Sequence, residues 1–180
     1  VHLKFNTGLN RLGFNEAEVD KIISELNATS TIKITSLFSH LAASEDLTEK
    51  YFSQSQISTF KNIAKNISSK LSYQPKLHMS NTSGILNYPE AQFDMVRSGI
   101  GLYGFSNIPE EQKNFIPIAT LKSVISQIHT IKKGDSVGYN RAFKSEGTIV
   151  TATIPIGHAD GISRAYGNGK GWVMVQGIKA

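Results

Sequence analysis

Glycines next to a hydroxyl form the first group of residues that could do chemistry. The run MVRSGIGLYG (Met95–Gly104) places Gly99 and Gly101 after a strand-like segment, and HMSNTSG (His78–Gly84) supplies the hydroxyl of Thr82. Backbone N–H groups of a glycine turn, joined by a hydroxyl donor, can bind a phosphate. Most glycine turns only reverse the chain, so these residues alone leave both interpretations open.

Isolated polar side chains are the second group. His40 and Arg97 each follow a strand-like segment, and Tyr139 lies in SVGYNRAF (Ser136–Phe143). Taken singly, each fits an ordinary structural role as well as a catalytic one. The chain has no cysteine, which excludes disulfides and cysteine nucleophiles within it. No spacing of His, Asp and Glu suggests a metal site.

Composition narrows the classes of function. The 180 residues are 39% hydrophobic and 18% charged, with a net charge of +5 spread along the chain. A nucleic-acid surface needs clustered Lys and Arg, so nucleic acid is not expected as a partner. An anionic ligand suits the charge equally well. No apolar run is long enough for a membrane helix and no signal peptide is visible, so we expect a cytoplasmic protein with no membrane partner.

Strands and helices are expected to alternate in the first half. Val1, Leu3 and Phe5 have strand periodicity, and an Asn15–Glu18 capping pattern precedes a helix. The sequence then predicts a strand over 32–38, a long helix from Thr48 to Leu71, a strand ending at His78, and short strand or turn elements over 94–97 and 101–103. Such alternation implies a parallel sheet, because parallel strands need crossover connections.

The second half is β-branched and favours antiparallel strands. We expect strands over 118–131, 137–139, 148–156 and 172–175. The predicted fold class is therefore α/β plus β, with residues 1–115 as part of a (β/α)8 barrel and 116–180 as the start of an antiparallel β domain. In such barrels the functional residues follow the strand C-termini, as His40, Thr82 and Arg97 do here.

The motifs together resemble a known family. VHLKFNTGLNRLGF at the N-terminus, HMSNTSG, MVRSGIGLYG, SVGYNRAF and IPIGHADG (Ile154–Gly161) match the alanine racemase family in order and rough spacing along nearly the whole chain. The resemblance implies a fold-type III pyridoxal-phosphate enzyme that interconverts L- and D-alanine and supplies D-alanine for peptidoglycan. It also implies a homodimer whose active sites are shared across the interface.

One family motif has no counterpart. No segment resembles Lys-Ala-Asn-Ala-Tyr-Gly, whose lysine holds the cofactor as a Schiff base. Such a lysine would lie upstream of Val1, and the chain opens without a starting Met inside a strand-like pattern. We therefore expect a central piece of an enzyme that is inactive by itself. Similar-looking sequences occur fused to a muramyl-peptide ligase, which this piece cannot reveal.

The resemblance assigns most cofactor contacts to the first half. The N–H groups of Gly99 and Ile100 would hold the phosphate, with Thr82 replacing a family serine. Arg97 would donate to the pyridine nitrogen. Arginine does not give up its proton, so the ring would stay a weaker electron sink. His40 would lie against the ring.

The resemblance also names a catalytic base. Racemisation removes a proton from one face of Cα and returns one to the other, and Tyr139 would serve the face opposite the absent lysine. A tyrosine pKa near ~10 needs tuning by hydrogen bonds and positive charge. The family's arrangement corresponds to a chain of contacts through Tyr139, His40 and Arg97.

Two further pairs of residues have counterparts in the family. Lys4 and Arg11 would orient the cofactor's phenolic oxygen, and some members carbamylate the lysine at this position. Here Asn6 replaces the usual acidic residue and Asn10 the usual glycine. His158, where many members have tyrosine, and Arg164 would line the substrate entryway.

Three rival functions stay open. A serine or broad-specificity racemase would differ in a substrate-facing segment after Ala180. A non-catalytic pyridoxal-phosphate-binding barrel would typically lack the β domain, which argues against it. The polypeptide alone could also have no function, because an incomplete barrel leaves strand edges unpaired.

Overall fold

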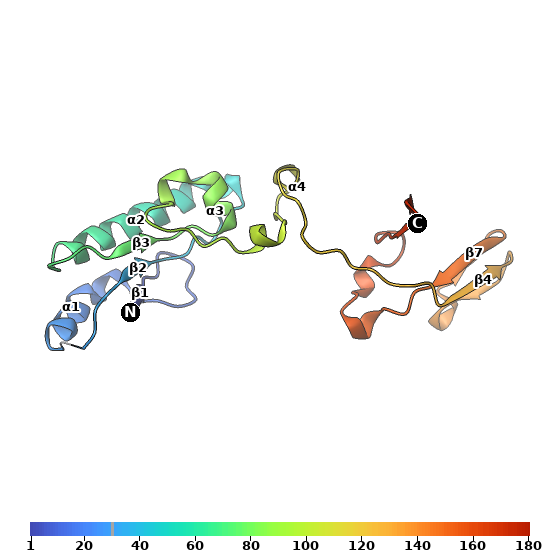
Figure 1. Ribbon diagram of the computed structural model, residues 1–180, viewed down its shortest axis with the longest axis horizontal. Helices are drawn as coiled ribbons and strands as arrows, with labels where there is room; N and C mark the ends of the chain where they lie inside the picture. The colour runs from blue at the N-terminus through green and yellow to red at the C-terminus, as the bar shows by residue number, and fades with distance from the viewer. Residues whose placement is uncertain (30) are drawn as a thin grey trace. The chain divides into compact units, whose positions relative to one another are not determined.

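The computed structural model describes residues 1–29 and 31–180. The chain forms two compact units, Val1–Ala119 and Thr120–Ala180 (Figure 1), which divide shortly after the junction predicted at 115/116. The first unit is α/β and the second is built from antiparallel strand pairs. The coarse prediction of an α/β part followed by a β part is confirmed.

A three-stranded parallel sheet organises the first unit. Its order is β1 (His2–Lys4), β2 (Ser36–Phe38) and β3 (Lys76–His78). The crossovers contain α1 (Val19–Asn27) and α2 (Lys50–Ser68), as the alternating pattern predicted. His2 lies opposite Ser36, and Phe38 lies opposite His78. All three strands therefore have their C-terminal ends at one edge of the sheet.

The two faces of this sheet differ in chemistry because side chains alternate along a strand. One set (Leu3, Phe5, Leu37, Leu77 and Met79) belongs to or packs against a buried apolar core with Ile57, Phe60, Ile63 and Ile67 of α2. The other set is His2, Lys4, Ser36, Phe38 and His78. Only the first face is covered by the helices' apolar stripes, so the second can carry polar chemistry.

The helix starts follow their capping residues. The Asn15 N–H donates to the Glu18 carboxylate (2.8 Å) at the one-turn 3-10 helix η1 (Glu16–Glu18) that leads into α1, as expected from the sequence. α2 follows η2 (Leu47–Glu49), where the Asp46 carboxylate accepts from the Thr48 N–H (2.9 Å). The helical segment thus begins at Leu47, one residue before the predicted Thr48.

Several short elements differ from the sequence-based expectation. α3 (Thr82–Asn87) was not predicted and is capped by Asn81, and η3 (Pro89–Ala91) follows it. Residues 94–97 form no strand, only a parallel bridge between His78 and Met95. Residues 101–103 belong to a 3-10 helix, η4 (Ile100–Tyr103), and α4 (Pro109–Gln112) begins at a proline. These elements are too short to leave a periodic signature.

The second unit contains three antiparallel pairs. β4 (Gln127–Ile131) pairs with β7 (Ile149–Thr153), β5 (Ser136–Val137) with β6 (Phe143–Lys144), and β8 (Met174–Val175) with β9 (Ile178–Lys179). The strand predicted over 118–131 is wrong in its first part, since only 127–131 has a ladder partner among the described residues. Ile118, Leu121 and Val124 are largely exposed.

Tyr139 is also not in a strand, contrary to the prediction. It opens the one-turn 3-10 helix η5 (Tyr139–Arg141) between β5 and β6. Two further one-turn 3-10 helices, η6 (His158–Asp160) and η7 (Arg164–Tyr166), follow β7. None of the described helices is both long enough and apolar enough to cross a membrane.

Candidate functional site

Arg97 joins the ends of two strands. Its Nη2 donates to the carbonyl oxygens of Ser39 (2.9 Å) and Met79 (3.2 Å), the residues that directly follow β2 and β3. Its own N–H donates to the Ser80 carbonyl (3.0 Å). Carbonyls at strand C-terminal ends are free of the ladder, so they can accept from a guanidinium. Arg97 is thereby held at the edge where the sequence placed the functional residues.

Both histidines next to Arg97 accept from it. Nη2 lies 3.1 Å from Nδ1 of His40, and Nη1 contacts Nδ1 of His78. A guanidinium can only donate, so each of these Nδ1 atoms carries no proton. Each neutral ring therefore has its proton on Nε2. The structure thus brings together His40 and Arg97, two of the three residues in the predicted tuning chain.

The site is strongly electropositive. Burial lowers the pKa of Lys4, and the nearby charges of Arg11 and Arg97 lower it further. Burial also lowers the pKa of His40, followed by the charges of Arg97, Arg11 and Lys4, while Glu45 opposes them. Burial alone lowers the pKa of Arg97. Arg11 and Arg97 both disfavour the charged form of Lys4, and this concentration of positive charge creates a site for an anion.

The loop that brings Arg11 to Lys4 folds back on β1. Phe14 N–H donates to the Lys4 carbonyl (2.9 Å) and Asn6 N–H to the Phe14 carbonyl (2.8 Å). At the base of this loop Gly13 has φ +123°, and a Cβ there would lie 2.9 Å from Asn6 N and 3.0 Å from Lys4 O. Only glycine fits such a close backbone approach.

The two departures from the family pattern in this loop support each other. Asn6 Nδ2 donates to Asn10 Oδ1 (2.8 Å), and Asn6 Oδ1 accepts from the backbone N–H groups of Asn10 (3.0 Å) and Gly8 (3.2 Å). Asn10 has φ +56°, a conformation that asparagine tolerates better than most residues with a side chain. Asparagine at position 10 therefore keeps the turn that a glycine would make.

Thr82 organises the glycine turn. Its Oγ1 accepts from the N–H groups of Gly99 (3.0 Å) and Gly101 (3.2 Å). A Cβ on Gly101 would lie 2.7 Å from the Thr82 methyl group, so this glycine is needed for packing. A Cβ on Gly99 would meet only Thr82 Oγ1, at 3.9 Å, so the space beside this hydroxyl is open among the described residues. Ile100 follows as the first residue of η4.

The remaining predicted site residues belong to the second unit. Tyr139 is almost fully exposed (96%) and follows Gly138, which has φ +83°. Asn140 and Arg141 also have positive φ, of 55° and 51°. His158 begins η6, and Arg164 begins η7. Left-handed non-glycine residues in succession are uncommon and indicate local backbone strain directly after Tyr139.

Sequence reasoning missed four contributors: two backbone carbonyls and the side chains of Ser36 and His2. The carbonyl groups of Ser39 and Met79 leave no trace in side-chain identity. Ser36 contacts Nε2 of His78 (3.1 Å) and Nδ1 of His2 (2.5 Å). The sequence could have indicated His2 and Ser36, because side chains alternate along a strand and this alternation places both residues on the same sheet face as Lys4 and His78.

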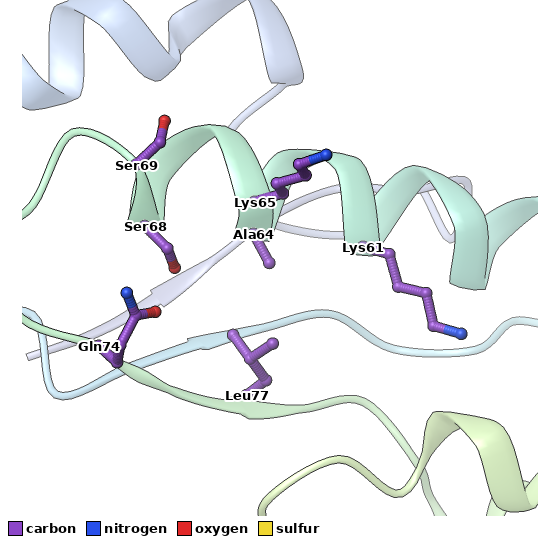
Figure 2. Close-up of a pocket in the computed structure, with 7 residues that line it drawn as sticks. All are labelled: Lys61, Ala64, Lys65, Ser68, Ser69, Gln74 and Leu77. Carbon is purple, nitrogen blue, oxygen red and sulfur yellow. The ribbon is translucent and has the colours of Figure 1, made fainter.

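Other features lie outside this site. A surface groove runs between α2 and β3 (Figure 2), and its lining residues are Lys61, Ala64, Lys65, Ser68, Ser69, Gln74 and Leu77. Leu77 has the parity of the helix-covered face, so the groove is not part of the cation site. No three His, Cys, Asp or Glu residues gather to hold a metal ion in the described parts of the chain.

Parallel strands that end in a cluster of cations, beside a glycine turn with a hydroxyl, are typical of an α/β protein that binds an anionic ligand. The alanine racemase N-terminal domain family matches residues 1–107, and the alanine racemase C-terminal domain family matches 118–180. The chain belongs to the alanine racemase family.

Relatives support this assignment along the whole chain. Alanine racemase of Treponema denticola is 37% identical over 170 residues, which cover 92% of this chain and 45% of the relative. That of Thermodesulfovibrio yellowstonii is 36% identical over 179 residues, which cover 98% and 46%. The chain thus spans about half the length of the curated relatives that it matches.

Solved structures show the same fold. Alanine racemase from Streptomyces lavendulae superposes with a TM-score of 0.89 at 29% identity, covering 99% of this chain and 48% of that one. Alanine racemase from Streptomyces coelicolor gives 0.91 at 27% identity, with the same coverage. Both units of this chain therefore have counterparts in racemase structures.

Proposed function

We propose that this chain is part of a pyridoxal-phosphate-dependent alanine racemase that interconverts L- and D-alanine. Its first unit would be the later part of a (β/α)8 barrel, and its second the start of the β domain. The observation that carries the proposal is the cluster of Lys4, Arg11 and Arg97 around His40, next to the Thr82 hydroxyl. A phosphorylated, phenolic cofactor is an anion that such a cluster can bind.

The glycine turn suits the cofactor's phosphate. Thr82 Oγ1 already accepts two backbone N–H groups, so its own proton is free to donate outward. The open space at Gly99 allows a phosphate to approach this hydroxyl and the turn's backbone. Lys4 and Arg11 would complement the phenolic oxygen. When bound, the cofactor withdraws electrons from the substrate and so acidifies its α-proton.

Arg97 would face the ring nitrogen as a fixed donor. Two carbonyls and two imidazoles fix its orientation, which leaves little freedom to rotate away. Because it keeps its proton, it orients the ring nitrogen without protonating it. His40 then carries its own proton on Nε2, where it can donate to another group. We propose that this group is the phenolate oxygen of a catalytic tyrosine.

Tyr139 is the tyrosine we assign to proton transfer. Its side chain is exposed, and the neighbouring Asn140 and Arg141 have positive φ, a backbone strain that is common near catalytic positions. In the homodimer that we infer, Tyr139 of one copy serves the cofactor of the other. Its phenolate would take the α-proton on one face, or its hydroxyl would return one there, with a lysine outside this chain serving the other face. His158 and Arg164 would line the entryway.

The full-length protein provides the test. It should bind pyridoxal phosphate and convert L-alanine to a racemic mixture, measured by chiral chromatography, with serine and other small amino acids as parallel substrates. Faster conversion of serine would favour the serine or broad-specificity alternative. Cofactor binding without conversion of any amino acid would favour a non-catalytic binding protein, which the presence of the second unit with Tyr139 argues against.

The biological role that we propose is the supply of D-alanine for peptidoglycan, made in the cytoplasm.

A further inference from the structure

A continuous series of polar contacts crosses the polar face of the sheet. From Arg97 Nη1 it passes to Nδ1 of His78, from Nε2 of His78 to Oγ of Ser36 (3.1 Å), and from Ser36 Oγ to Nδ1 of His2 (2.5 Å). One residue comes from each of β1, β2 and β3. The register makes this possible, because His2 lies directly opposite Ser36 and His78 lies one pleat further along.

Arg97 can only donate, so it determines which atom donates and which accepts in each hydrogen bond of this series. Arg97 donates to His78 Nδ1, so the His78 proton is on Nε2 and points at Ser36. Ser36 Oγ accepts it, so the Ser36 hydroxyl proton is free to donate to His2 Nδ1. If the His78 proton moved to Nδ1, two donors would face each other at Arg97.

We propose that Ser36, backed by His2, is a positioning residue that acts together with Arg97 to keep His78 in its Nε2–H tautomer, and so supports the orientation of Arg97. This role follows from the contacts themselves, and only the expected effect of Ser36 on racemisation rests on the proposed function. Ser36 Oγ is the acceptor that keeps the His78 proton on Nε2, and His2 is the acceptor that keeps the Ser36 hydroxyl turned away from it.

Burial and stacking make this arrangement selective. Ser36 and His78 are 2% and 3% exposed, so water cannot readily replace the hydroxyl. The Phe38 ring stacks on His78 with centroids 4.8 Å apart and planes at 11°, which fixes the plane in which both ring nitrogens point. Burial, followed by the charges of Arg97 and His2, lowers the pKa of His78 to about 4. This buried, positively charged environment favours a neutral His78 ring with a single tautomer.

Imidazole NMR on the full-length protein tests the proposal. With 15N-labelled histidine, long-range 1H–15N spectra distinguish the two neutral tautomers, and His78→Gln identifies the His78 signals. We expect the Nε2–H tautomer in the wild type and a mixture of both in Ser36→Ala. Ser36→Thr keeps the hydroxyl and should restore the wild-type pattern. His2→Phe keeps an aromatic ring without the acceptor and should give an intermediate result.

Catalysis supplies a second readout. Loss of one hydrogen bond in the series should lower kcat about tenfold in Ser36→Ala, with KM for alanine changed less and Ser36→Thr near wild type. An unchanged His78 tautomer in Ser36→Ala would overturn the proposal, whatever the activity. If the tautomer shifts as expected but the wild type racemises no amino acid, the proposed function fails and the positioning role stands.

Discussion

Arg97 shows how one side chain can determine the protonation of its neighbours. Because guanidinium only donates, the two histidines that contact it must both be neutral at Nδ1. The same reasoning applies at Thr82, where two backbone donors leave the hydroxyl proton to point outward. Changing a single hydrogen-bond donor or acceptor in this site should therefore affect its neighbours more than a change in net charge would.

Removing the Thr82 hydroxyl should weaken cofactor binding. In Thr82→Val, the N–H groups of Gly99 and Gly101 lose their acceptor and the phosphate loses a donor. The loss of a hydrogen bond to a charged group is worth about 1.5–3 kcal/mol, so we expect Kd for pyridoxal phosphate to rise about 10- to 100-fold. Absorbance titration measures it. Thr82→Ser should bind nearly as wild type, and equal losses in both variants would contradict the role of the hydroxyl.

Replacing Tyr139 should affect the two enantiomers differently. Tyr139→Phe removes the base from one face of Cα and leaves the opposite base in place. We expect solvent deuterium exchange at Cα to fall by about 100-fold or more for one enantiomer, within the usual range for general-base catalysis, and much less for the other. NMR of separate L- and D-alanine reactions measures this. Small, equal losses would mean that Tyr139 only packs.

Acid should destabilise the protein through His78. Its pKa of about 4 lies below the ordinary 6.5, so between these values the unfolded chain binds a proton that the folded chain excludes. The free energy of unfolding should therefore fall as pH drops from about 6.5 to about 4, by up to about 3 kcal/mol, and the contribution should level off below that window.

Two variants isolate this histidine. Denaturant unfolding of the full-length protein, followed by circular dichroism, should show a shallower pH dependence in His78→Gln than in wild type. His129→Gln changes an exposed histidine of β4 and should leave the wild-type slope intact. Equal slopes in all three proteins would assign the acid sensitivity to other groups.

At the scale of elements, the alternation of side chains along each short strand puts core residues on one face of the sheet and polar residues on the other. Each strand of the sheet has only three residues, yet the residues alternate between packing in the apolar core and facing the polar side, where His2, Ser36 and His78 form their series of hydrogen bonds. The loop after β1 then depends on backbone geometry, because Gly13 permits the return that places Arg11 beside Lys4. That loop makes a sharp prediction about glycine.

Alanine at position 13 should be much more harmful than alanine at a strained but open glycine. In Gly13→Ala both the positive φ and a Cβ within 3.0 Å of backbone atoms oppose folding, so we expect a loss of about 3 kcal/mol or more. Gly134 has φ +88° with nothing within 4 Å, so Gly134→Ala should cost about 1 kcal/mol. Thermal unfolding of the two full-length variants compares them, and similar melting temperatures would refute the steric argument.

At the scale of the molecule, the chain supplies about half of its relatives' length. Its sheet has three strands, and large apolar side chains such as Ile116, Leu121 and Ile178 are exposed. No segment matches the family's lysine motif. The 180-residue chain alone, given pyridoxal phosphate, should therefore not racemise alanine, whereas the full-length protein should. Turnover by the chain alone, comparable to that of the full-length protein, would mean that a lysine within it can hold the cofactor.

The sequence alone was enough to predict local features and family membership. The alternation of Val1, Leu3 and Phe5 and the apolar stripe of α2 are local periodicities, and the sequence motifs preserve the order of the site residues along the chain. The tertiary structure decided the contacts between distant segments. Arg97 meets Ser39, Met79 and two histidines only because β2 and β3 pair in one register, and hydrogen bonding depends on that register to within fractions of an ångström. Strand alternation could place Ser36 and His2 on the polar face, but their contacts, like that of Asn6 with Asn10, follow from distances that only the folded structure sets.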